Sequence, residues 1–433
     1  MWILSKILCN KMRKLAVFQT FLSRILILVL NFGLVIFTTN FWGSEGKGVI
    51  SMLIADLAII SFVSSIFVGS SVTFFASRFP KEKIVLYAYV WSVLVGLTVP
   101  FLLNFSLGHN TQFLPYLAVL SLVSALLSTN INLFVGMQNI KMYNLYSILQ
   151  LITHIIFIAV LVYILKLVSV SSYFIAQIAV LVLLFAVSSF QLLKNLHWSN
   201  FSLSKEIGKE MFRYGWNTQF SAFFQFLNYR LSYYFLEQFK GLASVGVFSV
   251  GVAISEAIWT LSRSLSVVLY SEAVNSTDSD FLVQRTKVSL KVSFMITLVF
   301  IGVILLIPAS VYTLIFGKDF SETKEIILLL SPGILAIATS NIIGHYFAGI
   351  NKLRILNVKS LVGVVFTILL SIYFVPNMGI AGACIVTTIS YLVSSLILFY
   401  EFYQRTPFHI EDFFFNKSEI RQIFNQFRKM LSL

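Results

Sequence analysis

The segment Gly241–Ser271 constrains the fold most. It has 31 residues between Lys240 and Glu272, and the only charged side chains within it are those of Glu256 and Arg263. A helix of this length would be ~46 Å long, which exceeds the ~30 Å hydrocarbon core of a bilayer. The segment therefore predicts a transmembrane helix. An ionised side chain near the middle of such a helix costs ~2.5–3.5 kcal/mol to insert, so each charge is a functional-site hypothesis.

The composition indicates that the whole chain, and not only this segment, lies in a membrane. Of 433 residues, 58% are hydrophobic and 11% are charged, whereas soluble domains carry about 25% charged residues. The chain is therefore predicted to be an all-α integral membrane protein. The net charge of +14 does not indicate a nucleic-acid partner, because the basic residues lie in connections between apolar segments rather than in a soluble basic domain.

Twelve apolar segments are long enough to be transmembrane helices. They lie at about 15–40, 48–72, 84–107, 112–137, 143–166, 171–193, 214–236, 242–270, 288–316, 326–350, 355–375 and 379–402. With the N-terminus in the cytoplasm, the inside connections and termini hold 23 Lys and Arg, Lys359 among them, and the outside loops hold 5. This bias predicts that both termini are cytoplasmic.

The longest inside connection divides the chain. We predict a bundle of six helices at 1–193, a cytoplasmic amphipathic linker at 194–213, a second six-helix bundle at 214–402 and a cytoplasmic tail at 403–433. Within the tail, apolar residues at helical spacing face basic residues over 418–431, which is typical of a helix lying on the membrane surface. The outside loops are too short to hold a catalytic domain.

An internal repeat relates the two bundles. Residues 133–147 match residues 346–360 at a constant offset of 213, which pairs Gly136 with Gly349 and Asn144 with Asn357. Six spans separate the copies, so both begin on the same side of the membrane. This is a parallel repeat, an arrangement that transporters use around a central site. A weaker echo relates Asp56 in the second span to Glu256 in the eighth.

Three elements carry a resemblance to a known family. They are Asn228-Tyr229-Arg230-Leu231 in the seventh span, the Phe347–Lys352 end of the tenth span and the Gly379–Ala383 start of the twelfth. The chain resembles the polysaccharide transport family, the Wzx-type oligosaccharide flippases of the multidrug/oligosaccharidyl-lipid/polysaccharide exporter superfamily. The resemblance implies a MATE-like pair of pseudo-symmetric six-helix bundles in the bacterial inner (plasma) membrane.

The same resemblance implies a function. It is the transfer of an undecaprenyl-pyrophosphate-linked repeat unit of O-antigen or capsular polysaccharide to the outer face by alternating access. The partners are this lipid-linked oligosaccharide and membrane lipids, with polysaccharide polymerase and chain-length proteins as further candidates. Two alternatives stay open: a small-molecule exporter of the same superfamily, and a flippase for lipid II or another lipid-linked glycan.

Three arginines within spans are candidates for the pyrophosphate: Arg24, Arg230 and Arg263. The planar guanidinium group suits phosphate through its fork of donors and permanent charge. We expect Arg24 and Arg263 to engage the pyrophosphate in the inward-open state and Arg230 to help draw it outward. The alternatives are that Arg24 and Arg230 extend to the headgroups and that Arg263 is a structural partner of Glu256 or of another acid.

Asp56, Glu256 and His345 are candidates for ion coupling or for structural pairing, and the sequence leaves H⁺ and Na⁺ open as the coupled ion. Tyr229, Tyr233 and Trp259 are weaker candidates for stacking on sugar rings. No P-loop, nucleophile elbow or cluster of metal ligands occurs in the sequence, so neither an enzyme nor a bound cofactor or metal is predicted.

Overall fold

The computed structural model describes residues 2–108, 111–194, 204–275, 278–409 and 413–414. The side chains of residues 2–22, 24, 107, 111, 193, 261, 271 and 275 are also outside the description. The helix predicted at 418–431 therefore lies outside the described residues, as do residues 195–203 of the predicted linker. Residues 205–213, the end of that linker, form the first turns of a long helix.

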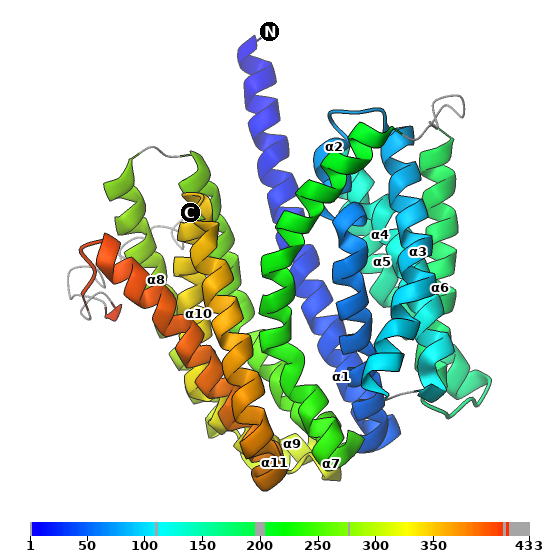
Figure 1. Cartoon of the computed structure of the whole chain (residues 1–433), viewed down its shortest axis with the longest axis vertical. Coiled ribbons are helices and arrows are strands. Elements are labelled where there is room, and N and C mark those ends of the chain that lie inside the picture. The colour runs from blue at the N-terminus through cyan, green and yellow to red at the C-terminus, as the bar shows by residue number, and fades with distance from the viewer. Residues whose placement is uncertain (1, 109–110, 195–203, 276–277, 410–412, 415–433) are drawn as a thin grey trace. The chain divides into compact units, whose positions relative to one another are not determined.

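The described residues are helical and contain no strand (Figure 1). The helices are α1 (Trp2–Val68), α2 (Ser70–Phe75), α3 (Lys81–Leu107), α4 (Leu114–Gly136), α5 (Ile140–Ala159), α6 (Ser171–Leu193), α7 (Lys205–Asn275), α8 (Ser279–Leu306), α9 (Ala309–Phe316), α10 (Thr323–Gly349) and α11 (Leu353–Arg405). The span predicted at 288–316 is in fact two helices, α8 and α9. Pro308 separates them, because proline disfavours helical backbone at the residue before it.

Three helices are each long enough to cross a membrane twice. Among the described residues, nine candidate spans occur, and three of them have 51, 56 and 53 residues. Each of the three contains one glycine with positive φ: Gly43 (65°), Gly241 (81°) and Gly379 (56°). This backbone conformation costs ~1–2 kcal/mol for a residue with a Cβ atom, so glycine makes the turn. Dividing each helix at its glycine gives twelve spans, as predicted.

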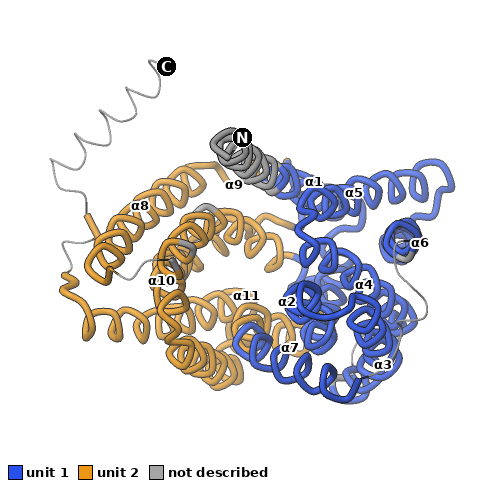
Figure 2. Tube along the Cα trace, turned by 90° about the horizontal axis from the view of Figure 1, so that it is seen from above, with its two compact units in different colours: residues 1–223, 242–246, 315–319 blue, residues 224–241, 247–314, 320–433 orange. Residues whose placement is uncertain are grey.

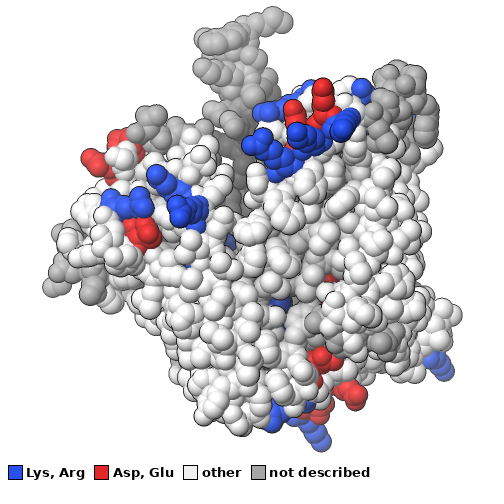
Figure 3. Space-filling model, in the orientation of Figure 1, with Lys and Arg blue, Asp and Glu red and all other residues white. Residues whose placement is uncertain are grey.

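The surface agrees with this class. On the face shown in Figure 3, charged side chains gather toward the ends of the helices, and the region between them is almost uncharged. An uncharged belt of this kind is what contact with hydrocarbon requires.

The chain forms two compact units (Figure 2). Unit 1 comprises Met1–Phe223, Leu242–Gly246 and Ile315–Asp319, and unit 2 comprises Phe224–Gly241, Val247–Leu314 and Phe320–Leu433. The core of unit 1 is built mainly from α1 to α6. Among the described residues of unit 2, core clusters are built from α7, α8, α10 and α11.

The sequence repeat is also a structural repeat. At the end of α4, the N–H groups of residues 137, 138 and 139 donate to the carbonyls of 133, 135 and 134. At the end of α10, residues 350, 351 and 352 donate to 346, 348 and 347, which is the same pattern 213 positions later. Gln138 and Asn351 occupy the left-handed position, with φ of 61° and 60°.

Close packing at the repeat is matched as well. A Cβ atom on Gly136 would lie 2.6 Å from the Cβ of Ala76 in unit 1, and one on Gly349 would lie 2.4 Å from the Cβ of Ala273 in unit 2. Real Cβ atoms do not approach so closely, so both helix ends require glycine at this position.

A second matched contact lies within unit 1. A Cβ atom on Gly48 would lie 1.9 Å from the carbonyl oxygen of Leu242, and one on Gly246 would lie 1.9 Å from that of Ser44. Ser44 and Leu242 are 198 positions apart, as are Gly48 and Gly246. The two contacts are therefore reciprocal. At Ser44 the helix start is also capped, because its N–H and hydroxyl donate to the Asp319 carboxylate at 3.1 and 2.8 Å.

Candidate functional site

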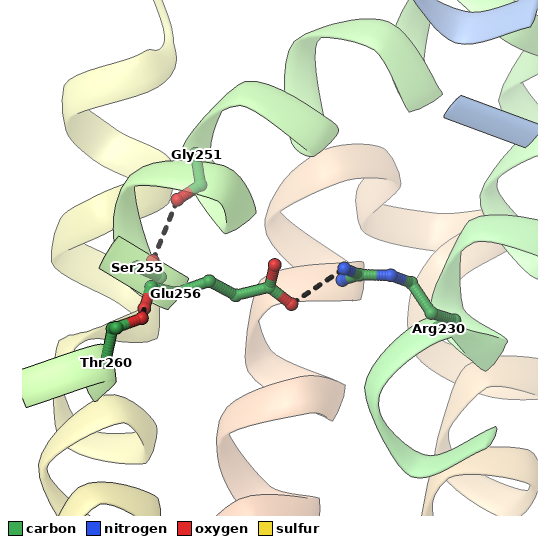
Figure 4. Close-up of polar contacts among 5 residues, drawn as sticks. All are labelled: Arg230, Gly251, Ser255, Glu256 and Thr260. Carbon is green, nitrogen blue, oxygen red and sulfur yellow. Dashed lines mark hydrogen bonds and ion pairs between the residues drawn. The ribbon is translucent and has the colours of Figure 1, made fainter. Parts of the chain in front are cut away.

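An ion pair within the membrane-spanning part of unit 2 is the centre of the candidate site (Figure 4). Arg230 precedes the Gly241 turn of α7 and Glu256 follows it. The turn brings the two parts of α7 side by side, and Arg230 Nη2 lies 2.7 Å from Glu256 Oε1. The side chains are 23% and 32% exposed, so protein encloses most of each. The two charges stabilise each other in a place where either alone would be costly.

Arg230 has one unused donor. Its Nη1 atom is buried and has no hydrogen-bond partner among the described residues. An unsatisfied buried donor costs ~1–3 kcal/mol, and more when charged. The guanidinium carbon also lies 5.2 Å from the centroid of the Tyr233 ring, a cation–π distance. Arg230 thus binds one carboxylate oxygen through Nη2, and the donors of its Nη1 atom have no partner among the described residues.

The hydroxyl groups of Ser255 and Thr260, which lie near Glu256, already donate their hydrogens within the helix. Ser255 donates to the carbonyl of Gly251 at 2.8 Å, and Thr260 donates to the carbonyl of Glu256 at 2.7 Å. Both bonds lie within the same helix (Figure 4). The carboxylate of Glu256 is therefore the group that this turn of α7 presents to Arg230.

Aromatic rings adjoin the ion pair. The ring centroids of Tyr229, Trp259 and Tyr391 lie 5.1, 5.5 and 5.9 Å apart. Trp259 and Tyr391 are buried, and Tyr229 is half-buried. The predicted stacking residues Tyr229 and Trp259 are therefore together, but their neighbours cover most of the ring surface. Tyr233 packs on Phe248, with ring centroids 5.5 Å apart.

Asn228 fixes the helix just before Tyr229 and Arg230. Its Oδ1 atom accepts hydrogen bonds from the hydroxyls of Thr367 and Ser390, and its Nδ2 atom donates to Ser394 at 3.3 Å. All three partners lie on α11. Sequence reasoning used Asn228 only as part of a family resemblance and missed this role. The signal was the density of hydroxyl residues in the last two spans.

The other predicted residues are distributed as follows. Asp56 is buried in α1 of unit 1. Arg263 is exposed in the part of α7 after Gly241, and Glu256 pairs with Arg230 rather than with Arg263. His345 in α10 makes a 2.8 Å hydrogen bond from Nδ1 to the carbonyl of Asn341. The side chain of Arg24 is outside the described part of the structure.

Comparison with known proteins identifies the fold. No family model matches the chain. The chain is 26% identical over 215 residues to the capsular polysaccharide biosynthesis protein CapF of Staphylococcus aureus, which covers 48% of this chain and 53% of that protein. The chain thus matches about half the length of this relative.

Solved structures match over most of the chain. An inward-facing multidrug resistance MATE family transporter of the MOP superfamily has a TM-score of 0.70 at 16% identity, covering 88% of this chain and 94% of that one. The lipid II flippase MurJ in an inward closed conformation has a TM-score of 0.69 at 17% identity, covering 92% and 89%. The chain therefore has the fold shared by these two structures, and its candidate spans are those of a multi-pass membrane protein.

Proposed function

We propose that this protein is a flippase that carries a lipid-linked oligosaccharide repeat unit from the cytoplasmic face of a bacterial inner membrane to the outer face by alternating access. The observation that carries the proposal is Arg230, a permanent cation within the membrane-spanning part of unit 2 with a buried, unused donor. The transporter fold and the partial likeness to a capsular polysaccharide biosynthesis protein support it.

The substrate class follows from the chemistry that has to cross. A lipid-linked sugar joins a polar glycan and an anionic pyrophosphate to an apolar tail. Guanidinium groups bind phosphate oxygens through two parallel hydrogen bonds. Arg230 supplies one such group, and Arg24 and Arg263 are proposed to supply others. Asp56, Glu256 and His345 remain candidates for coupling to H⁺ or Na⁺, and Glu256 also neutralises Arg230.

Deletion in the source bacterium tests the proposal. We expect lipid-linked repeat units to accumulate on the cytoplasmic face and surface glycan to disappear. Wild-type protein restores export, and Arg230→Gln restores less than a tenth of it. Unchanged surface glycan in the deletion strain contradicts the assigned substrate.

Experiments with the same deletion strain also distinguish the two alternative functions, a lipid II flippase and a small-molecule exporter. MurJ has nearly the same TM-score as the MATE transporter, so lipid II is the second candidate substrate. Rescue of a strain depleted of its lipid II flippase favours lipid II. Increased drug sensitivity on deletion, with intact surface glycan, favours small-molecule export.

A further inference from the structure

Lys359 is a buried lysine that pairs with no carboxylate among the described residues. It lies six residues after the start of α11, ~9 Å along the helix. A lysine at that depth can usually extend its amine to the membrane surface, but Lys359 is only 5% exposed, so protein encloses it. It also has no hydrogen bond within the described part of the chain. A charge of this kind within a span is a functional-site hypothesis.

His345, a basic side chain from another helix, links Lys359 to Arg263. His345 lies four residues before the end of α10 and is within electrostatic range of both Lys359 and Arg263. Arg263 likewise has no ion pair with a described residue. Three helices, α7, α10 and α11, thus bring basic groups together without a described acid that pairs with them.

The surroundings add an uncharged donor. Ser360, next to Lys359, donates to the Oε1 atom of Gln225 at 3.3 Å. The Nε2 atom of Gln225 is buried and has no hydrogen-bond partner among the described residues. The region is therefore rich in donors and poor in acceptors, which is the reverse of a cation site and the chemistry that an anion needs.

The cluster and Arg230 lie at different depths. His345 and Lys359 flank the turn between α10 and α11, and Arg263 is 12 residues, ~18 Å, before the end of α7. Both of these helix ends lie on the side predicted to be cytoplasmic. Arg230 is 11 residues, ~16 Å, from the Gly241 turn on the opposite side.

We propose that Arg263, His345 and Lys359 form an anion-binding site in unit 2 that receives the phosphate groups of the substrate on the cytoplasmic side, before Arg230. This assignment rests on the proposed function and adds Lys359 and His345 to its binding residues. The repulsion among the basic groups is relieved when a multiply charged phosphate binds, so the site has its highest affinity for pyrophosphate rather than for a single carboxylate.

The test uses the purified full chain in detergent and inorganic pyrophosphate as the probe. Pyrophosphate should raise the thermal unfolding midpoint of the wild type. Lys359→Met should weaken pyrophosphate binding at least tenfold, and Lys359→Arg should retain most of it. Lys352→Met is the matched control, because Lys352 is exposed in the turn that precedes α11 and the charge change is the same.

Stability separates a binding role from a structural one. Lys359→Met removes an unpaired buried charge, so its midpoint without pyrophosphate should rise. A lower midpoint, or pyrophosphate binding equal to that of the wild type, overturns the proposal. If Lys359→Met does not fold, His345→Gln gives the same decision, because it should weaken binding several-fold at an unchanged midpoint.

Two further results separate the sources of the phosphate and the two proposals. A Lys359-dependent response to phosphatidylglycerol in nanodiscs, with none to pyrophosphate, assigns the site to a lipid headgroup and overturns the substrate assignment. Lys359-dependent pyrophosphate binding in a protein whose deletion leaves glycan export intact supports the anion site and contradicts the proposed function. If deletion abolishes glycan export but the purified protein does not bind pyrophosphate, the result supports the proposed function and contradicts the anion site.

Discussion

The end of α4 in unit 1 and the end of α10 in unit 2 share a backbone but differ in chemistry. Both have the same three hydrogen bonds and a glycine packed on an alanine. The residue 213 positions before Lys359 is Tyr146, whose hydroxyl donates to Gln191 at 2.9 Å. The residue 213 positions before His345 is Asn132, which donates to the carbonyl of Ser128 at 2.8 Å.

Unit 1 therefore has neutral, hydrogen-bonded side chains where unit 2 has basic ones. The ion pair shows the same contrast: 198 positions before Arg230 and Glu256 lie Phe32 and Ala58. The reciprocal glycine contacts define an offset of 198 positions between the two copies. Asp56 and Glu256 are 200 positions apart, so they are not equivalent positions in this alignment. The two copies of the repeat therefore share their glycine packing, whereas the charged residues at these positions occur in the unit 2 copy.

The largest effect should come from filling the matched glycine positions. Gly136→Leu and Gly349→Leu each place a new Cβ atom within 2.6 Å of an alanine side chain, and each should cost ~3 kcal/mol. Thermal unfolding in detergent measures this. Gly33→Leu and Gly302→Leu are controls, since both positions have open space. A large loss in only one of the two units breaks the structural equivalence.

The ion pair should give the next largest effect. Glu256→Gln leaves Arg230 without its counter-ion and should lower the free energy of unfolding by ~2 kcal/mol, less than for a fully buried pair. Combining it with Arg230→Gln should recover part of this loss. Additive losses in the double variant contradict a direct interaction. Ala58→Ser in unit 1 is the control at the matched position and should have little effect.

A smaller effect is expected at Tyr146, the counterpart of Lys359. Tyr146→Phe removes a buried hydrogen bond to Gln191 and should cost ~1 kcal/mol. Pyrophosphate binding should not change. Because Lys359→Met is expected to raise stability, the two matched positions should respond with opposite signs. The same sign at both positions means that Lys359 is a structural residue.

The smallest effect concerns the cap at the first glycine turn. Asp319→Asn weakens the acceptor for Ser44 and removes a negative charge from a helix N-terminus, which should cost ~0.5 kcal/mol. High salt should reduce the difference between variant and wild type. Asp278→Asn, at the exposed N-terminus of α8, is a comparison of the same kind in unit 2.

The sequence predicted the architecture because apolar length, basic residues in connections and glycine spacing are local signals. Twelve spans and the repeat at an offset of 213 both follow from such signals. The pairing of Arg230 with Glu256 does not, because the two residues are 26 positions apart and lie in different predicted spans. A long arginine side chain and the Gly241 turn bring them together.

The burial of a side chain by distant helices is also not predictable from the local sequence pattern. Lys359 was counted with the cytoplasmic connection because it lies near the start of a span, and only the packing of α11 shows that protein encloses it. Asn228 is similar, since its three hydroxyl partners lie more than 130 positions away on α11.

The turns at Gly43, Gly241 and Gly379 have a consequence for access to the protein from outside the membrane. Each joins an odd-numbered span to the next even one, so all three lie on the same face, and each interrupts a helix at one residue. A protease that acts at that face therefore finds no extended loop to cleave at these three turns.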